Sequence, residues 1–311
     1  MSDTLLTVDH IHKQYNTVKA IDGLSFSINK GEIFALLGPN GAGKTTTVRT
    51  INNIILPDDG TISFNLNGTV SNSLPAHQIG YLPEERGLYP DLKVVYTLSY
   101  FGMLHGMKKA DANASANKWL DKMGLLDRAN EKLDSLSKGN QQKVQFIASV
   151  LHQPDFVVLD EPFSGLDPVN QEFFLELISE LRDQGMTILL SAHQMQMVER
   201  IADRLLLIDH GQQVLHGTLP EIRSQHHIDK KVILKVGEQL KSKDLDTLNL
   251  SNQIEIFPDN EIQFTIKNED DLSEILGKLS GIAKIRDINS ERISLHDIFI
   301  QTVQKRNEGG E

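Results

Sequence analysis

The chain has 311 residues, a formal net charge of −11 at pH 7 and no cysteine. Its length suggests about two domains, and its acidic balance argues against a general nucleic-acid binder, which usually presents a basic face. Without cysteine it can form neither disulfides nor thiolate metal sites, which suits a reducing compartment.

Neither the N-terminus nor the apolar runs carry a targeting or membrane signal. Residues 1–4, Met-Ser-Asp-Thr, lack the basic-then-apolar layout of a signal peptide. The longest apolar runs, such as Phe156–Leu159 and Ile201–Ile208, are short or carry charges, and they fall below the ~20 residues needed to cross a bilayer. We therefore expect a soluble chain, and any membrane role must come through a partner.

The first motif in chain order is a glycine-rich loop between a predicted strand and a predicted helix. Residues 38–45 read G-P-N-G-A-G-K-T and fit the phosphate-binding pattern G-x-x-x-x-G-K-[ST]. An apolar strand over 32–37 precedes the loop, and helical spacing over 45–55 follows it. In such a loop backbone N–H groups and the helix N-terminus surround phosphate. Lys44 should reach the outer phosphates, and the Thr45 hydroxyl should hold Mg²⁺.

The rest of the first 217 residues alternates strand-like and helix-like segments, which predicts an α/β sheet with covered faces. A mostly helical insert is expected over about 91–152. The further predicted elements are helices over 96–105, 114–123, 170–184 and 193–202, and strands over 156–159 and 187–190.

The strand over 156–159 ends in two carboxylates, Asp160 and Glu161. The first can enter a Mg²⁺ shell, because Mg²⁺ prefers carboxylate and water oxygens. The second can polarise an attacking water as a general base. An acidic pair after a strand is often only a solvated strand end, so its meaning comes from the phosphate loop upstream. Ser137 precedes an apolar helical run over 144–151 and, by itself, reads as an ordinary N-cap.

The pattern of apolar and polar residues changes near residues 217–220. A polar segment over 221–230 is typical of a short helix plus linker, and residues 231–306 predict a small βαββαβ-like second domain. Residues 307–311 form a tail that we expect to fray. The elements predicted here are strands over 231–236, 253–257, 261–266 and 282–288, a turn over 258–260, and helices over 244–248, 270–279 and 294–303.

Taken together, the motifs over residues 4–217 resemble the ATP-binding subunit of an ATP-binding cassette (ABC) transporter. Residues 38–46 match its Walker A segment, 156–161 its Walker B segment, 136–140 its L-S-G-G-Q signature and 164–167 its D-loop. His193 stands where the family has its switch histidine, and Tyr15 stands where it stacks an aromatic on adenine.

The resemblance implies an α/β P-loop NTPase core with a helical insert over residues 1–220, a small α+β C-terminal domain, and ATP and Mg²⁺ as cofactors. It assigns catalysis to Glu161, His193 and Lys44. It assigns metal binding to Thr45, Glu84 and Asp160. It assigns nucleotide contacts to Tyr15, Gly38, Pro39, Asn40, Gly41, Ala42, Gly43, Lys44, Thr45, Thr46, Ser137 and Gly139.

Two segments depart from the family pattern. Glu84 replaces the glutamine of the Q-loop; it still offers an oxygen to the metal but adds negative charge near the triphosphate. Lys138 and Asn140 replace glycine and glutamine in the signature, while Ser137 and Gly139 remain. These departures keep open the alternative of a soluble ATP-binding regulatory or sensor protein that is not coupled to transport.

The resemblance also implies partners. Two copies would form a head-to-tail homodimer, in which Ser137 and Gly139 of one subunit complete the other's site. A membrane permease would dock at residues 84–90 and the helical insert, on the cytoplasmic face of the membrane. We favour this interpretation over the alternative, an ordinary apolar turn at 88–90 that packs on its own domain. The sequences of residues 82–90, 136–143 and 294–299 resemble those of a bacterial branch of the family. This branch includes sodium-efflux (NatA-like) subunits and multidrug exporters.

One further alternative is a soluble ABC protein that acts on ribosomes or DNA. Such proteins typically carry two cassettes or a long coiled-coil insert. Here there is one cassette, residues 91–132 are too short for that insert, and a strong basic patch is missing. We therefore expect no nucleic-acid partner.

Overall fold

The computed structural model divides the chain into two compact units, Met1–Gly217 and Thr218–Glu311. It describes residues 4–66, 68–85, 87–225, 230–237, 255–266, 272–281 and 283–308.

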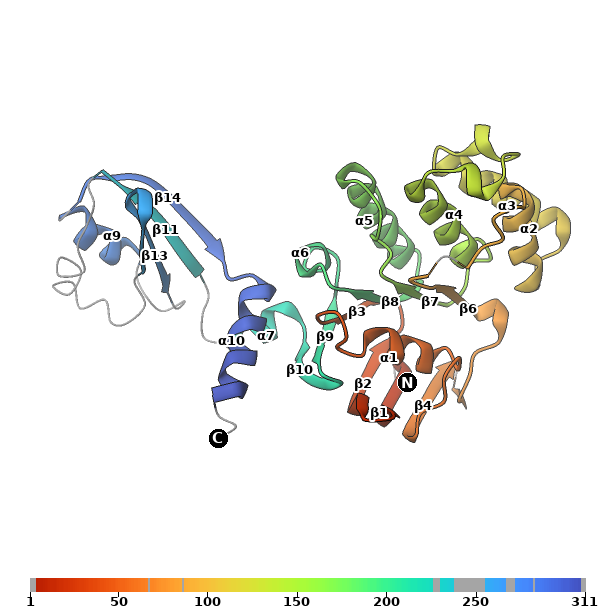
Figure 1. Cartoon of the computed structure of the whole chain (residues 1–311), viewed down its shortest axis with the longest axis horizontal. Helices are drawn as coiled ribbons and strands as arrows, with labels where there is room; N and C mark the ends of the chain where they lie inside the picture. The colour runs from red at the N-terminus through yellow and green to blue at the C-terminus, as the bar shows by residue number, and fades with distance from the viewer. Residues whose placement is uncertain are drawn as a thin grey trace. The chain divides into compact units, whose positions relative to one another are not determined.

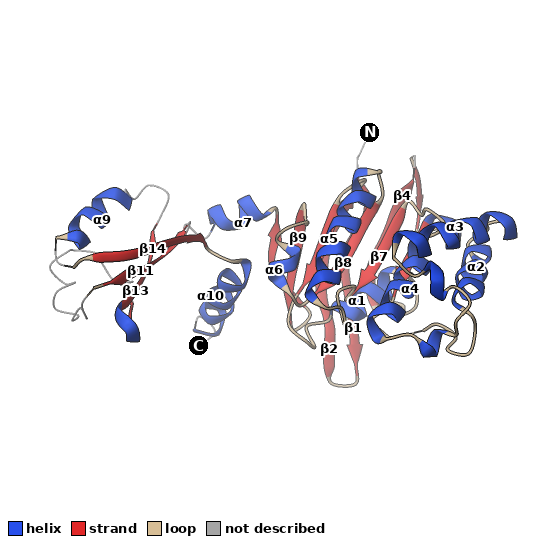
Figure 2. Ribbon diagram, turned by 90° about the horizontal axis from the view of Figure 1, so that it is seen from above, coloured by secondary structure: helices blue, strands red, loops and turns tan. Residues whose placement is uncertain are grey.

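A six-stranded sheet in the order β10-β9-β3-β8-β7-β6 forms the centre of the first unit (Figure 2). Its strands are β3 (Ile33–Leu37), β6 (Ile79–Leu82), β7 (Phe156–Asp160), β8 (Thr187–Ala192), β9 (Arg204–Asp209) and β10 (Gln212–Gly217). All are parallel except β10, which pairs antiparallel with β9. Every residue of β3, β7 and β8 is buried, as expected for parallel strands covered on both faces. Because the strands run the same way, the loops that follow β3, β7 and β8 emerge at one edge.

A second, antiparallel sheet of four strands packs against the first. Its strands, in the order β2-β1-β4-β5, are β1 (Thr4–Tyr15), β2 (Val18–Asn29), β4 (Asp59–Leu66) and β5 (Thr69–Ser71). The Phe26 ring stacks on Phe34 of the central sheet with centroids 5.3 Å apart. The sequence analysis predicted one sheet and missed this one. Positive φ at His10 (46°) and a register shift between Val8 and Ile11 interrupt the apolar alternation of β1.

Helices cover both faces of the central sheet. Helix α1 (Lys44–Ile51) lies between the two sheets, and α4 (Lys138–Val150) and α5 (Pro168–Asp183) lie on the opposite face (Figure 1). Phe146 of α4 packs edge-on against Phe174 of α5, with centroids 4.9 Å apart. The remaining helical elements are α2 (Val94–Leu104), α3 (Lys109–Lys122), α6 (Met195–Val198), and the 3-10 turns η1 (Ala76–Gln78), η2 (Leu126–Arg128) and η3 (Leu133–Ser135).

The helix predicted over 193–202 was too long at both ends. Only α6, Met195–Val198, is helical. Gln194 has a non-helical ψ of 85°, and the His193 side chain is held by a hydrogen bond to Glu161. The contact between His193 and Glu161 therefore takes the start of this segment out of the helix.

The second unit contains a four-stranded antiparallel sheet in the order β12-β13-β11-β14. Its elements are α7 (Leu219–Gln225), β11 (Lys230–Val236), β12 (Glu255–Phe257), η4 (Pro258–Asn260), β13 (Glu261–Ile266), α9 (Leu272–Ser280), β14 (Ile285–Arg292) and α10 (Leu295–Glu308). Ile275 and Leu279 of α9 pack with Val232, Leu234 and Phe264 of the sheet in one apolar core. The short helix predicted over 244–248 lies outside the described residues.

Within the parts of the chain that the structure describes, no helix is both long enough and apolar enough to cross a membrane. Helix α5, for example, has 16 residues and alternates buried apolar with exposed charged positions.

Two stacked histidine rings join the helical segment to the central sheet. His105 follows α2 and His152 follows α4; their ring centroids are 3.8 Å apart, with planes 11° from parallel. His152 Nε2 lies 3.0 Å from the carbonyl oxygen of Ile79, and its Nδ1 is buried with no hydrogen-bond partner among the described residues. Burial, and then the neighbouring His105, lower the pKa of His152 from 6.5 to about 4.

This pKa predicts a loss of stability in mild acid. Between pH 6.5 and about 4 the unfolded chain binds a proton at His152 that the folded chain does not, so the free energy of unfolding falls as the pH falls through that window. We expect His152→Asn to remove roughly 1–2 kcal/mol of that pH dependence, allowing for solvent screening at a half-buried ring. Urea unfolding followed by the fluorescence of Trp119, the chain's single tryptophan, measures it.

His210→Asn is the matched control, because its ring is 92% exposed. Equal slopes of stability against pH in wild type and His152→Asn would contradict the assignment.

Candidate functional site

The glycine-rich loop runs from the end of β3 to the start of α1 and closes around its own lysine. Lys44 Nζ donates hydrogen bonds to the carbonyl oxygens of Gly38 (2.9 Å) and Pro39 (3.2 Å), and the side chain is buried. Gly43 has φ 104°, and a Cβ there would lie 2.1 Å from the Ala20 carbonyl oxygen. Only glycine fits this position, because strand β2 approaches the loop so closely.

The other residues predicted in this loop are within the same turn. Ala42 is buried and its N–H donates to the Pro39 carbonyl oxygen at 3.2 Å, whereas Asn40 and Gly41 are exposed. Thr45 and Thr46 lie in the first turn of α1, and both are half-buried. The exposed tip and the helix start leave backbone N–H groups free to approach phosphate.

Asp160 is fully buried at the end of β7, with one oxygen satisfied and one not. The Ser191 hydroxyl donates to its Oδ1, while Oδ2 is buried and has no partner among the described residues. Burial is the main reason that the pKa of Asp160 is raised, and the negative charges of Glu84 and Glu161 add to it. An orphaned carboxylate oxygen in such a place is costly and is the donor type that a hard cation such as Mg²⁺ takes.

Glu161 follows Asp160 in a left-handed backbone conformation, with φ 51°. Its N–H donates to the carbonyl (3.1 Å) and the hydroxyl (3.2 Å) of Ser191, which hold this conformation. Its carboxylate lies 2.8 Å from His193 Nδ1, which donates to it when protonated, and 3.6 Å from Lys44 Nζ. Non-glycine residues rarely adopt this conformation, and such strain clusters at functional sites.

Glu84, just after β6, also reaches this edge of the sheet. The Thr45 hydroxyl donates to Glu84 Oε2 at 3.3 Å. Glu84 and Thr45 both also influence the Asp160 carboxylate, so the three predicted metal-binding residues, Thr45, Glu84 and Asp160, are near one another. In the described parts of the chain no group of three His, Asp or Glu residues is arranged to hold a metal by itself. A metal here would need oxygens from a bound phosphate as well, as is usual for Mg²⁺.

Three predicted nucleotide contacts make no hydrogen bond or ion pair to this cluster among the described residues. Ser137 caps α4 by accepting from the Asn140 N–H at 3.4 Å and is exposed. A Cβ on Gly139 would sit 3.5 Å from the Gly165 carbonyl oxygen, so the signature packs beside the D-loop. Tyr15, at the end of β1, is exposed and has Lys13 Nζ 5.7 Å from its ring centroid. Among the hydrogen bonds and ion pairs of the described residues, none joins Ser137, Gly139 or Tyr15 to the glycine-rich loop.

Sequence reasoning missed two buried glutamines of α4 that support the site. Gln145 Nε2 donates to the carbonyl oxygens of Pro83 and Glu85, at 3.0 Å each. Gln142 Nε2 donates to the Pro162 carbonyl oxygen at 3.2 Å. The two polar residues stand three apart on the buried face of a helix, which is the pattern that could have identified them.

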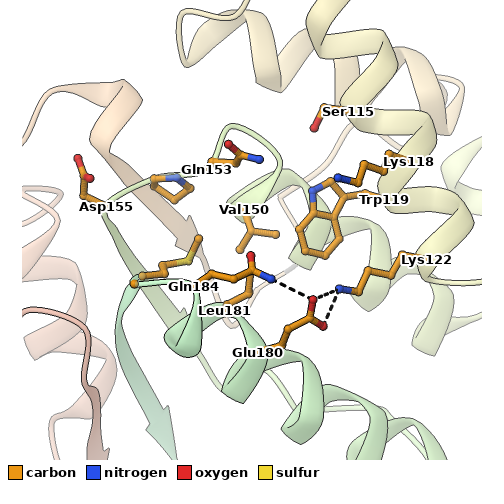
Figure 3. Close-up of a pocket in the computed structure, with 13 residues that line it drawn as sticks. Ser115, Lys118, Trp119, Lys122, Val150, Gln153, Asp155, Glu180, Leu181 and Gln184 are labelled. Carbon is orange, nitrogen blue, oxygen red and sulfur yellow. Dashed lines mark hydrogen bonds and ion pairs between the residues drawn. The ribbon is translucent and has the colours of Figure 1, made fainter.

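A separate cavity of about 410 Å³ lies between α3 and the end of α5, with Trp119 on its wall (Figure 3). Lys122 Nζ lies 2.7 Å from both oxygens of Glu180, and Gln184 Nε2 donates to the same carboxylate at 3.0 Å. Lining residues 153–155 and 184–186 precede β7 and β8. The cavity is therefore at the amino ends of these strands and is not part of the site at their carboxyl ends.

Comparisons with known proteins agree with this geometry. A family model described as ABC transporter matches residues 21–164, and one described as ATP-binding protein DrrA1-3-like, C-terminal domain, matches residues 217–303.

Individual relatives extend the match to nearly the whole chain. The uncharacterized ABC transporter ATP-binding protein YhaQ of Bacillus subtilis (strain 168) is 42% identical over 299 residues, which cover 96% of this chain and 98% of YhaQ. The linearmycin resistance ATP-binding protein LnrL of the same organism is 35% identical over 236 residues, 75% of each chain. A solved ATP-binding subunit of an ABC transporter matches with a TM-score of 0.65 and 33% identity, covering 71% of this chain and 93% of that one. The chain therefore belongs to the ATP-binding subunits of ABC transporters, with an ABC-type ATPase domain and a DrrA-like C-terminal domain.

Proposed function

We propose that this chain is the ATP-hydrolysing subunit of a bacterial ABC exporter and that ATP-driven head-to-tail dimerisation powers a separate membrane permease. The observation that carries the proposal is the placement of Glu161. It is held in a strained backbone conformation within 3.6 Å of Lys44 Nζ and 2.8 Å of His193 Nδ1, where a general base for water attack on a terminal phosphate belongs.

In the proposed reaction, Lys44 and the N–H groups of the loop bind the phosphates of ATP. Glu161 accepts the proton of the attacking water, and His193 orients the Glu161 carboxylate through their hydrogen bond. Thr45, Asp160 and Glu84 would hold Mg²⁺, which supplies charge neutralisation at the phosphates when bound. Tyr15, exposed at the end of β1, would stack on adenine.

The dimer completes each site in this proposal. Gly139 lies beside the D-loop of its own chain, and among the hydrogen bonds of the described residues none joins Ser137 or Gly139 to the glycine-rich loop. They are therefore available to a second copy. A solved neighbour is described as a dimeric post-hydrolysis state of an ATP-binding cassette bound to ADP and Pi; at 21% identity it supports the fold only.

The permease would dock at residues 84–90 and on α2, at the cytoplasmic face of the membrane. Tyr89, Tyr96 and Leu104 support this surface, because they are 50%, 57% and 55% exposed and large apolar side chains in water are typical of interaction sites. Gln145 ties the loop to α4 through two hydrogen bonds.

The names of relatives favour export of an organic solute. They include proteins for linearmycin resistance, daunorubicin resistance and Nod factor export, at 32–36% identity. A drug-like solute is therefore the cargo class we favour. Transport of sodium, which the sequences of the motifs suggested, stays a prediction.

We also propose the domain limits of the sequence analysis: an ATP-binding domain over 1–220 with its helical insert at 91–152, a linker over 221–230, an accessory domain over 231–306 and a tail over 307–311. The division of contacts after Gly217 supports the main boundary. Residues 226–229 and 309–311 are outside the described parts.

Lys44→Ala should lower the affinity for Mg–ATP by about a hundredfold, because the loop loses its buried, charge-assisted phosphate donor. Fluorescence titration with a labelled ATP measures the change. Lys138→Ala is the control, since this exposed lysine lies outside the loop and should leave binding to the single chain unchanged. Unchanged affinity in folded Lys44→Ala would exclude the proposed phosphate site.

Glu161→Gln should bind ATP but hydrolyse it at least about a hundredfold more slowly, the scale of a lost general base, and should accumulate as an ATP-bound dimer. Turnover is measured against protein concentration, and mass by light scattering. Hydrolysis at the wild-type rate would show that Glu161 is not the base. Binding without turnover or dimerisation in wild type would instead favour the sensor alternative.

A further inference from the structure

The carboxylate of Glu84 adds a negative charge beside the predicted phosphate site. Its Oε2 accepts from the Thr45 hydroxyl at 3.3 Å, next to the loop lysine. The negative charges of Glu84 and Glu161 both act on Asp160, and we call these three carboxylates the acidic edge. Among the described residues, the ion pairs to the acidic edge come from Lys44 and His193, and both go to Glu161.

This charge distribution is unfavourable for the binding of a nucleotide that carries no metal ion. The triphosphate tail of ATP carries several negative charges, and a carboxylate a few ångströms away repels it. Glutamine at position 84 would offer a similar oxygen without the charge. A divalent cation between carboxylate and phosphate oxygens turns the repulsion into attraction.

In the described residues no group of three metal-binding side chains is formed. A Mg²⁺ ion at the acidic edge would take further oxygens from the phosphates, as is usual for this ion. Asp160 Oδ2 is buried and has no hydrogen-bond partner among the described residues. This oxygen would also be stabilised by a cation that arrives with the nucleotide.

We propose that Glu84 makes the site selective for the magnesium complex of ATP and excludes the metal-free nucleotide. The inference rests on the proposed nucleotide-binding function of the same site. Glu84 thereby acts as a specificity-determining residue. Its negative charge repels the metal-free triphosphate, and its carboxylate oxygen would coordinate the metal.

The test is the binding of a fluorescent ATP analogue, mant-ATP, to the full chain with Mg²⁺ and with EDTA. In wild type the dissociation constant should rise strongly when Mg²⁺ is removed. In Glu84→Gln this rise should be at least about tenfold smaller, mainly because metal-free analogue binds more tightly. Glu84→Asp retains the charge and should behave like wild type.

Glu85→Gln is the matched control. It removes the same charge one residue along the chain, but the Glu85 side chain is 86% exposed and lies 3.6 Å from Arg49 Nη2. Its dependence on Mg²⁺ should equal that of wild type.

Each result decides between the hypotheses. If Glu84→Gln keeps the wild-type dependence on Mg²⁺, or if Glu85→Gln loses it equally, the selectivity of Glu84 is excluded while nucleotide binding stands. If folded wild type binds the analogue under neither condition, the proposed function fails as well.

Discussion

The position of β8 between β3 and β7 is the constraint on which the candidate site depends. Parallel pairing sets Leu37 beside Ala192 and Asp160 beside Ser191. One strand therefore aligns the glycine-rich loop, the two carboxylates and the histidine that follows it. A shift of one residue in this register would turn the Ser191 hydroxyl away from Asp160. The buried strands give the register its strength, because each has its apolar side chains covered on both faces.

That alignment places energetically unfavourable features at the site where ATP hydrolysis is proposed. Asp160 is buried with an oxygen unsatisfied, and Glu161 is held in a left-handed conformation; each feature costs stability. Lys44 is turned back on the loop's own carbonyl oxygens. A phosphate with its metal would relieve two of these features, since it offers Lys44 an anion and Asp160 a cation. The site is thus arranged so that binding of a phosphate and its metal would contribute favourable energy.

The sequence predicted the parts of this site that are local in the chain and missed those that are tertiary. Strand, loop and helix around Lys44 follow from composition over a few residues, and the pair at 160–161 gains meaning from that motif. The roles of Gln142, Gln145 and Ser191 depend on which segments become neighbours, and periodicity does not reveal that. The antiparallel sheet was missed because a bulge breaks the alternation of β1. Helix α6 begins two residues later than predicted because the His193 side chain is held by Glu161.

Helix α4 gives the proposed transport cycle a physical connection. Ser137, which would meet the partner's nucleotide, caps its start, and Gln145 holds the backbone of Pro83 and Glu85 from within the same helix. At a rise of 1.5 Å per residue, these points are about 12 Å apart on one rigid element. In the proposed dimer, a nucleotide that pulls on Ser137 would move the helix and, with it, the loop at which a permease would dock. The two hydrogen bonds from Gln145 would make that loop follow the helix, because breaking them would leave buried polar groups unsatisfied.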